Sequence, residues 1–267
     1  MRALALAVAA AASVACGVPL AKLPAGSGVR ATDASAALDQ ATAACRGIRS
    51  LTAEVGVSGS ANGHRVRGRI TAGVAAPGSA RLEAVAPFGP PLFIFVATGN
   101  DATLLLPRDD RVLRHGRPSE VLNAVAGVPL DASDLRELMT GCAAGGAAES
   151  AQARAFGADW RVVPTSHDGE LYLRREQESA PWRLVAVTAR SDDGRRWRAD
   201  FLDFQNSLPR TIRLTSSGAA PFDLRLALSQ VETNVALDAD VFRVQIPASA
   251  VPITLEELRR SGPLATQ

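Results

Sequence analysis

The stretch from Arg81 to Leu106, RLEAVAPFGPPLFIFVATGNDATLLL, restricts the fold of this chain more than any other. Apolar and polar residues alternate over 81–86, which predicts a β-strand with one buried face. Residues 92–96 are apolar without alternation, so a second strand there needs cover on both of its faces. The Pro-rich turn between the two strands places Phe88 at a tip where a polar residue is usual. We therefore expect a β-rich protein with large apolar surfaces to cover.

The N-terminal residues have the features of an export signal. Arg2 precedes an apolar run that is too short to span a membrane, and Ser13-Val14-Ala15 has the small residues of a cleavage site. We assign residues 1–15 to a signal peptide. Residues 16–32 begin with Cys16 and are rich in Gly, Pro and Ala, which predicts a flexible tether. An ordinary disordered N-terminus explains this composition equally well.

Helices interrupt a long series of predicted strands. Asp33 is a suitable N-cap for a helix that ends near Gly47. Residues 51–74 form a predicted hairpin around Asn62-Gly63. A helical insertion at 118–157 contains two short helices, the first with a proline in its opening turn.

Further strands follow this insertion, and the last of them is expected at Val241 to Ile246 before a short terminal helix. The total is about eleven to twelve antiparallel strands. A meander of this length curls into an open half-barrel rather than staying flat. We expect one mainly β domain over 33–267, with the short helices as a lid.

Eight large apolar residues are candidates for lining a cavity in this domain, although each is also explained as ordinary core. They are Leu92, Phe93, Ile94, Phe95, Trp182, Trp197, Phe201 and Phe222.

Two cysteines remain after Cys16. In an oxidising compartment Cys45 and Cys142 are expected to form a disulfide, and two buried free thiols are the alternative. The predicted strand after Asn62-Gly63 carries an arginine row, Arg65, Arg67 and Arg69, on one face. This row is explained by a solvated outer face, by contact with anionic lipid headgroups or by an acidic partner.

Catalytic and metal-binding patterns are weak. His64, His115 and His167 lack the close spacing of metal ligands. The pair His167-Asp168 is explained by a turn, so we expect no enzyme, no cofactor and no metal; an enzyme with an unrecognised site is the least favoured hypothesis. The net charge of +2 over 267 residues argues against nucleic acid as a partner.

Four patches resemble the LolA/LolB superfamily of outer-membrane lipoprotein carriers and receptors, most closely the LolB-like lipoproteins. They are 81–92 with its Pro-Phe-Gly turn, 121–141 (VLNAVAGVPLDASDLRELMTG), 208–214 (LPRTIRL) and 234–247 (NVALDADVFRVQIP).

The resemblance implies a curved sheet with a helical lid over an apolar cavity that takes the acyl chains of lipoproteins. Ser13 to Cys16 is similar to a lipoprotein box, so Cys16 would carry the lipid anchor, and a plain signal peptide is the alternative. Phe88 would hand cargo to the membrane. The implied partners of this monomer are lipid acyl chains, a periplasmic carrier protein and the outer membrane, on its periplasmic side.

A soluble periplasmic location is the alternative to outer-membrane anchoring. A periplasmic sensor or envelope-assembly lipoprotein, which binds a protein partner on the same scaffold, is the alternative function.

Overall fold

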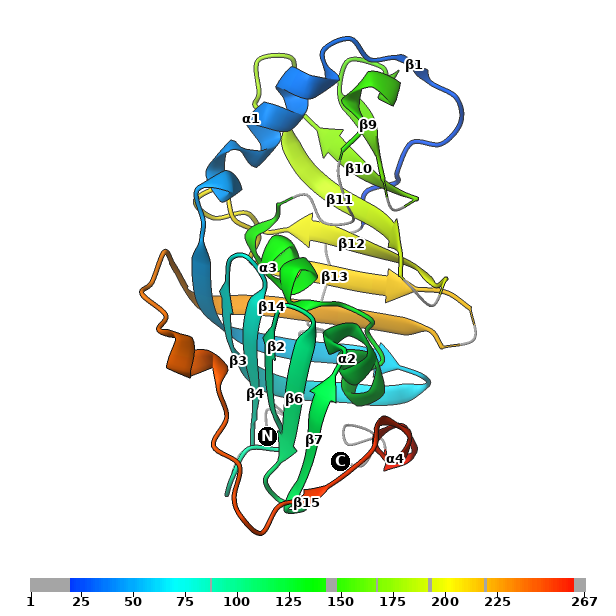
Figure 1. The fold of residues 1–267 in the computed structure, drawn as a ribbon. Coiled ribbons are helices and arrows are strands. Elements are labelled where there is room, and N and C mark those ends of the chain that lie inside the picture. Colours follow the sequence, from blue (N-terminus) through cyan, green and yellow to red (C-terminus); the bar gives the residue numbers. More distant parts are fainter. Residues whose placement is uncertain are drawn as a thin grey trace, which may run out of the picture.

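A single open sheet organises the described part of the chain. The computed structural model describes residues 20–86, 88–142, 148–166, 168–191, 194–218 and 220–261. All fifteen strands of that part belong to one sheet, in the order β1-β8-β9-β10-β11-β12-β13-β14-β2-β3-β4-β5-β6-β7-β15 (Figure 1). Strands β1 and β15 are the two edges and do not pair with each other, so the sheet is not closed. The predicted fold class, a mainly β open curved sheet with a few short helices, is confirmed.

Strands consecutive in sequence are hydrogen-bonded neighbours almost throughout, and all pairs except β15–β7 are antiparallel. The long strands β14 and β2 pair with each other and join the two halves of the sheet. One half contains β1 and β8 to β14, and the other contains β2 to β7 and β15. The bounds are β1 Val29–Arg30, β2 Ser50–Ala61, β3 His64–Ala75, β4 Ser79–Val85, β5 Ile94–Thr98, β6 Asp101–Leu106, β7 Arg111–Gly116, β8 Arg154–Phe156, β9 Trp160–Thr165, β10 Gly169–Arg174, β11 Arg183–Arg190, β12 Arg196–Leu202, β13 Thr211–Ser216, β14 Phe222–Thr233 and β15 Val251–Pro252.

The structure has more strands than the sequence pattern predicts, because β1, β8 and β15 contain only two or three residues. Alternation cannot be recognised in segments so short. The prediction of a strand at Val241 to Ile246 is wrong. A 3₁₀ helix, η2 (Ala239–Phe242), begins this region. The Arg81 side chain, through Nη1, donates to the carbonyls of Val241 and Arg243 at 3.2 and 3.1 Å, so a side chain of β4 satisfies backbone groups here.

Both faces of the apolar segment at 92–96 are covered by other parts of the chain. Phe93 and Phe95 are buried in the main core, and Phe95 is fully inaccessible. Val96 points to the opposite face and is also buried. The C-terminal segment that contains η2 contacts β4 and β5. The non-alternating pattern therefore marks a strand covered by the chain's own C-terminal segment.

Residues 20–32 are the described part of the expected flexible tether. In the structure this segment contacts the sheet. Leu23 packs against Val162, Tyr172 and Ala186 on the outer face of the sheet. The Arg198 side chain donates to the carbonyl of Ala21 at 2.9 Å. Apolar burial and satisfied backbone groups thus hold this segment on the sheet. Residues 1–19, with the predicted signal peptide and Cys16, lie outside the described residues.

Four α-helices accompany the sheet: α1 (Ala34–Arg46), α2 (Pro118–Ala126), α3 (Ala132–Thr140) and α4 (Leu255–Ser261). Helix α1 packs on β9, β10 and β11, whereas α2 and α3 lie over the other part of the sheet (Figure 1).

Asp33 occupies the predicted N-cap position of α1, which ends at Gly47, but its side chain makes no capping hydrogen bond. Its carboxylate instead accepts from Nε and Nη2 of Arg161 at 2.6 and 2.8 Å. These hydrogen bonds lower the pKa of Asp33. The stronger bidentate partner has displaced the local cap.

Candidate functional site

An apolar cavity of about 100 Å³ lies between the sheet and the lid helices α2 and α3. Every residue that lines it is aliphatic or methionine. The lining is Val55, Val57, Ile70, Ala72, Leu82, Leu122, Ala126, Val128, Leu130, Leu135, Leu138, Met139, Ile212, Leu214, Leu224, Leu226 and Leu228. The cavity therefore offers an apolar ligand only dispersion contacts and release from water.

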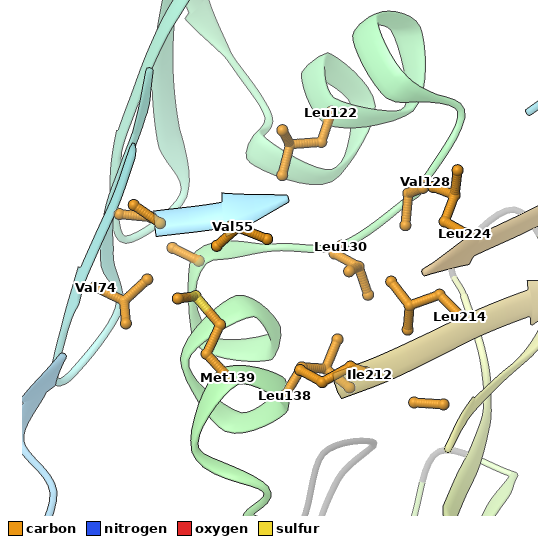
Figure 2. Close-up of a cluster of buried hydrophobic side chains, with 14 of the residues drawn as sticks. Val55, Val74, Leu122, Val128, Leu130, Leu138, Met139, Ile212, Leu214 and Leu224 are labelled. Carbon is orange, nitrogen blue, oxygen red and sulfur yellow. The ribbon is translucent and has the colours of Figure 1, made fainter. Parts of the chain in front are cut away.

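Period-two alternation positions the sheet side of the cavity. Val55 and Val57 project from β2 on the same face as Ile70 and Ala72 of β3. Register pairs Val55 with Ile70 across the two strands. Strands β13 and β14, on the other side of β2, add further leucines and Ile212 (Figure 2). The cavity thus spans the junction between the two halves of the sheet.

Helical spacing positions the lid side. Leu135, Leu138 and Met139 stand at i, i+3 and i+4 on α3, so they share the face that lines the cavity. Figure 2 shows Leu138 and Met139 on this face. Asp131 begins this helix: its side chain accepts from the backbone N–H of Asp134 at 2.8 Å, and the Asp134 carboxylate accepts from the N–H of Asp131. This reciprocal cap satisfies two amide groups at the start of the helix.

Glycines end both lid helices. Gly127 and Gly141 have φ of 71° and 67°, in the left-handed region where a side chain would be strained. The short connection that follows Gly127 brings Val128 and Leu130 into the cavity wall. The two short helices predicted within 118–157 are therefore present, but the predicted insertion also contains strand β8, which belongs to the sheet.

Both lid helices are attached to other parts of the fold, and on α2 the Arg195 side chain donates to the side-chain oxygen of Asn123 at 2.9 Å and to the carbonyl of Gly127 at 3.1 Å. Cys142 directly follows the end of α3 and forms the predicted disulfide with Cys45 at the end of α1, with a Cα–Cα distance of 5.6 Å. Helix α2 packs against the terminal helix α4, where Leu258 is fully buried. A two-residue parallel pairing of β15 with β7 holds the segment before α4. Any opening of the lid must strain or release these contacts.

Glu137 is a partly buried carboxyl group on α3. Burial raises its pKa to about 7, the neighbouring Asp134 and Asp131 add to that rise, and Arg136 opposes it. The Arg136 guanidinium lies 3.7 Å from the carboxylate. The lid helix therefore carries a group that changes charge near neutral pH.

None of the eight aliphatic and aromatic residues that we predicted as cavity lining is part of the wall of this cavity. Phe93, Phe95, Phe201 and Phe222 are buried elsewhere in the main core. Leu92 is partly buried against that core, and Ile94 is partly buried on β5.

The two tryptophans among the predicted residues, Trp182 and Trp197, are buried in the main core and also have polar neighbours. Arg161 and Arg175 lie 4.8 and 4.7 Å from the Trp182 ring, and the side-chain oxygen of Gln40 accepts from its backbone N–H. Trp197 is buried beside a polar groove that contains Arg196.

The cavity residues that we missed do have a sequence signal. Alternation over 222–228 and the i, i+3, i+4 spacing of the lid helix both mark apolar faces. The prediction instead selected large apolar side chains, six of which are aromatic. The pairing of β14 with β2, two strands that are far apart in the sequence, decides which apolar faces meet.

Phe88 is 87% exposed, as expected for the tip of the turn after β4. The Arg108 side chain, from the neighbouring β6–β7 turn, donates to the carbonyls of Phe88 and Pro90 at 2.8 and 3.2 Å. These hydrogen bonds attach the two turns to each other. Phe88 is thus presented to solvent by an anchored backbone.

Within the described ranges, no group of three His, Cys, Asp or Glu side chains could hold a metal ion. His115 is exposed beside Asp101, His64 is exposed, and His167 lies outside the described residues. No helix in the described part of the chain is long and apolar enough to cross a membrane.

Comparison by sequence finds no matching family model and no matching curated protein. Comparison by structure finds a LolA superfamily protein from Nitrosomonas europaea, with a TM-score of 0.57 and 14% identity over 80% of this chain and 99% of that one. A DUF1329 family protein from Desulfovibrio piger has a TM-score of 0.51 and 12% identity, over 80% and 98%. This chain therefore has the fold of the LolA superfamily protein.

Proposed function

We propose that this protein binds acyl chains of a lipid or lipoprotein in the cavity under α2 and α3, and that it takes part in lipoprotein trafficking or insertion at the outer membrane. The observation that carries the proposal is the exclusively aliphatic and methionine lining. Such a wall favours a hydrocarbon chain and has no group for acid–base or nucleophilic chemistry. No reaction is part of the proposal.

The energy for binding comes from burial of methylene groups, at roughly 0.8 kcal/mol each. The cavity volume of about 100 Å³ is below the range of about 300–1,000 Å³ that ligand sites usually have. A long acyl chain therefore requires α2 and α3 to move away from the sheet. The apolar faces of β2, β3, β13 and β14 would then be covered by the ligand in place of the lid.

Delivery of the cargo would use Phe88. Its exposure and the Arg108 hydrogen bonds present an apolar ring that can enter the boundary of a bilayer. We propose that Cys16 carries the lipid anchor and that a periplasmic carrier protein supplies the cargo.

The test is native mass spectrometry of the full chain purified from its own membranes, alongside the Cys16→Ala form. We expect a dissociable lipid mass in both forms. The substitution Ile70→Trp fills the cavity and should remove that mass. Thr71→Trp is the matched control, because the next residue of β3 is exposed and points to the opposite face.

Loss of the lipid mass in Ile70→Trp with retention in Thr71→Trp supports acyl binding in the cavity. Absence of a lipid adduct from every form contradicts the proposal. A protein that copurifies without any lipid would instead favour the sensor or envelope-assembly function.

A further inference from the structure

The arginine row (Arg65, Arg67 and Arg69) lies on the outer face of β3, opposite to the cavity. Its members alternate with Val66 and Ile70, which contact the core. Consecutive members are about 7 Å apart, since each residue of a strand advances about 3.3 Å. All three arginines are exposed.

Among the described residues, no carboxylate pairs with this row. Its cross-strand partners on β2 are Ser60, Ser58 and Gly56, which are uncharged. The nearest acids beyond β2 are already occupied: Asp223 accepts two hydrogen bonds from Arg213, at 2.7 and 2.8 Å. On β4, Glu83 pairs with Arg81 at 3.2 Å. Glu54 lies on the same face of β2, opposite Thr71, and offsets part of the charge at the Arg69 end, so the row has a net positive charge with no salt bridge to an acid among the described residues.

Exposed apolar groups continue this surface. Register pairs Arg69 with Val85, so their side chains share the outer face. Val85 is 42% exposed, and Phe88 follows three residues later at 87%. Cationic and apolar groups side by side are typical of surfaces that bind the headgroup region of a membrane.

The N-terminal segment reaches the same surface. Leu20, the first described residue, lines an outer-face groove together with Arg65, Ser58 and Ser60. Leu20 is four positions after Cys16 in the sequence, so the two can be at most about 14 Å apart. A lipid on Cys16 would consequently enter the bilayer near the arginine row.

We propose that the membrane-binding surface, defined as Arg65, Arg67, Arg69, Val85 and Phe88, rests on a bilayer that contains anionic phospholipid. The arginines contact the headgroups, and Val85 and Phe88 enter the boundary with the acyl region. This orientation leaves the lid helices, on the opposite face of the sheet, away from the membrane surface (Figure 1). Docking of the protein on the bilayer in this way does not require a ligand in the cavity.

The test measures binding of the full-length Cys16→Ala form, which lacks an acyl anchor, to vesicles by flotation. Neutral phosphatidylcholine vesicles are compared with vesicles that also contain phosphatidylglycerol, at low and high salt. We expect binding to the anionic vesicles and its loss at high salt. Each arginine should contribute roughly fivefold, so substitution of all three by Gln should weaken binding about a hundredfold.

The matched control changes the same charge elsewhere: Arg46→Gln, Arg174→Gln and Arg183→Gln on α1, β10 and β11. All three residues are exposed, and β10 and β11, with α1 packed on them, lie in the part of the sheet that is remote from β3 (Figure 1). The control should bind within about threefold of the parent, since screening limits distant charges to about a Debye length. Thermal unfolding checks that both triple variants are folded.

Three results would overturn the proposal: equal binding to neutral and anionic vesicles, no effect of the Arg65, Arg67 and Arg69 substitutions, or an equal loss in the control. No binding to either vesicle would also overturn it and would point to an acidic protein partner. None of these outcomes alters the lipid mass in native mass spectrometry, so the two proposals fail separately.

Discussion

Cys142 directly follows the last turn of lid helix α3, and its disulfide with Cys45 ties that turn to the end of α1. Helix α1 packs on β9, β10 and β11, away from the sheet region that α3 covers. The disulfide therefore links the lid to the opposite half of the sheet. Opening of the lid at this end is restricted by a covalent bond, whereas α2 is held by packing against α4 and β6 and by hydrogen bonds from the Arg195 side chain.

Replacing both cysteines by serine should lower the free energy of unfolding. The disulfide closes a loop with a sequence separation of 97 residues, for which loop entropy predicts about 4–5 kcal/mol. Urea denaturation measures the change, and the reduced parent protein should match the double variant. An unchanged midpoint would show that the disulfide does not restrain the unfolded chain.

Stability should fall as pH rises from about 4.5 to about 7, because the folded state retains the Glu137 proton over that interval. Over that interval the folded protein binds more protons than the unfolded chain. The resulting loss in the free energy of unfolding is complete above the interval. It amounts to at most about 3 kcal/mol. Glu137→Gln should remove this dependence in urea denaturation performed on either side of the interval.

Exposed Glu178 provides the control for that experiment. Glu178→Gln should keep the parent's pH dependence. If Glu137→Gln also keeps it, the Glu137 carboxyl is not the group that titrates in the lid.

Phe88→Ser should slow the transfer of acylated cargo from the protein to vesicles, because it removes the most exposed large apolar side chain of the described chain. The lipid mass that remains bound in native mass spectrometry should be unchanged, since Phe88 is not part of the cavity wall. A stopped-flow transfer assay with a fluorescent acyl chain measures the rate. Equal rates would exclude Phe88 from the transfer step.

Leu258→Ala should loosen the lid from its α4 side. Leu258 is fully buried where α4 packs against α2, and truncation of a buried leucine costs about 2–5 kcal/mol. Amide hydrogen exchange over Pro118–Ala126 should become faster. Arg259→Ala, at the exposed neighbouring position, should leave that exchange unchanged. Protected amides in the Leu258 variant would mean that α4 does not fasten α2.

The sequence alone determined the local features of this protein. Alternation marked β2, β3 and β14, Asn62-Gly63 marked the hairpin turn, and Pro118 and Gly127 bounded the first lid helix. The exposure of Phe88 could be predicted because a Pro-rich turn rarely buries its tip. Each of these depends on neighbouring residues, so a short window of sequence contains the relevant physics.

Only the tertiary structure decided which residues face one another. The cavity lining depends on the pairing of β14 with β2, which brings Leu226 opposite Val57 across more than half of the chain. Asp33 binds Arg161 in place of its own helix, and the C-terminal segment covers β5 in place of forming a strand. These contacts arise from long-range packing and charge pairing, whose partners no local pattern of residues can specify.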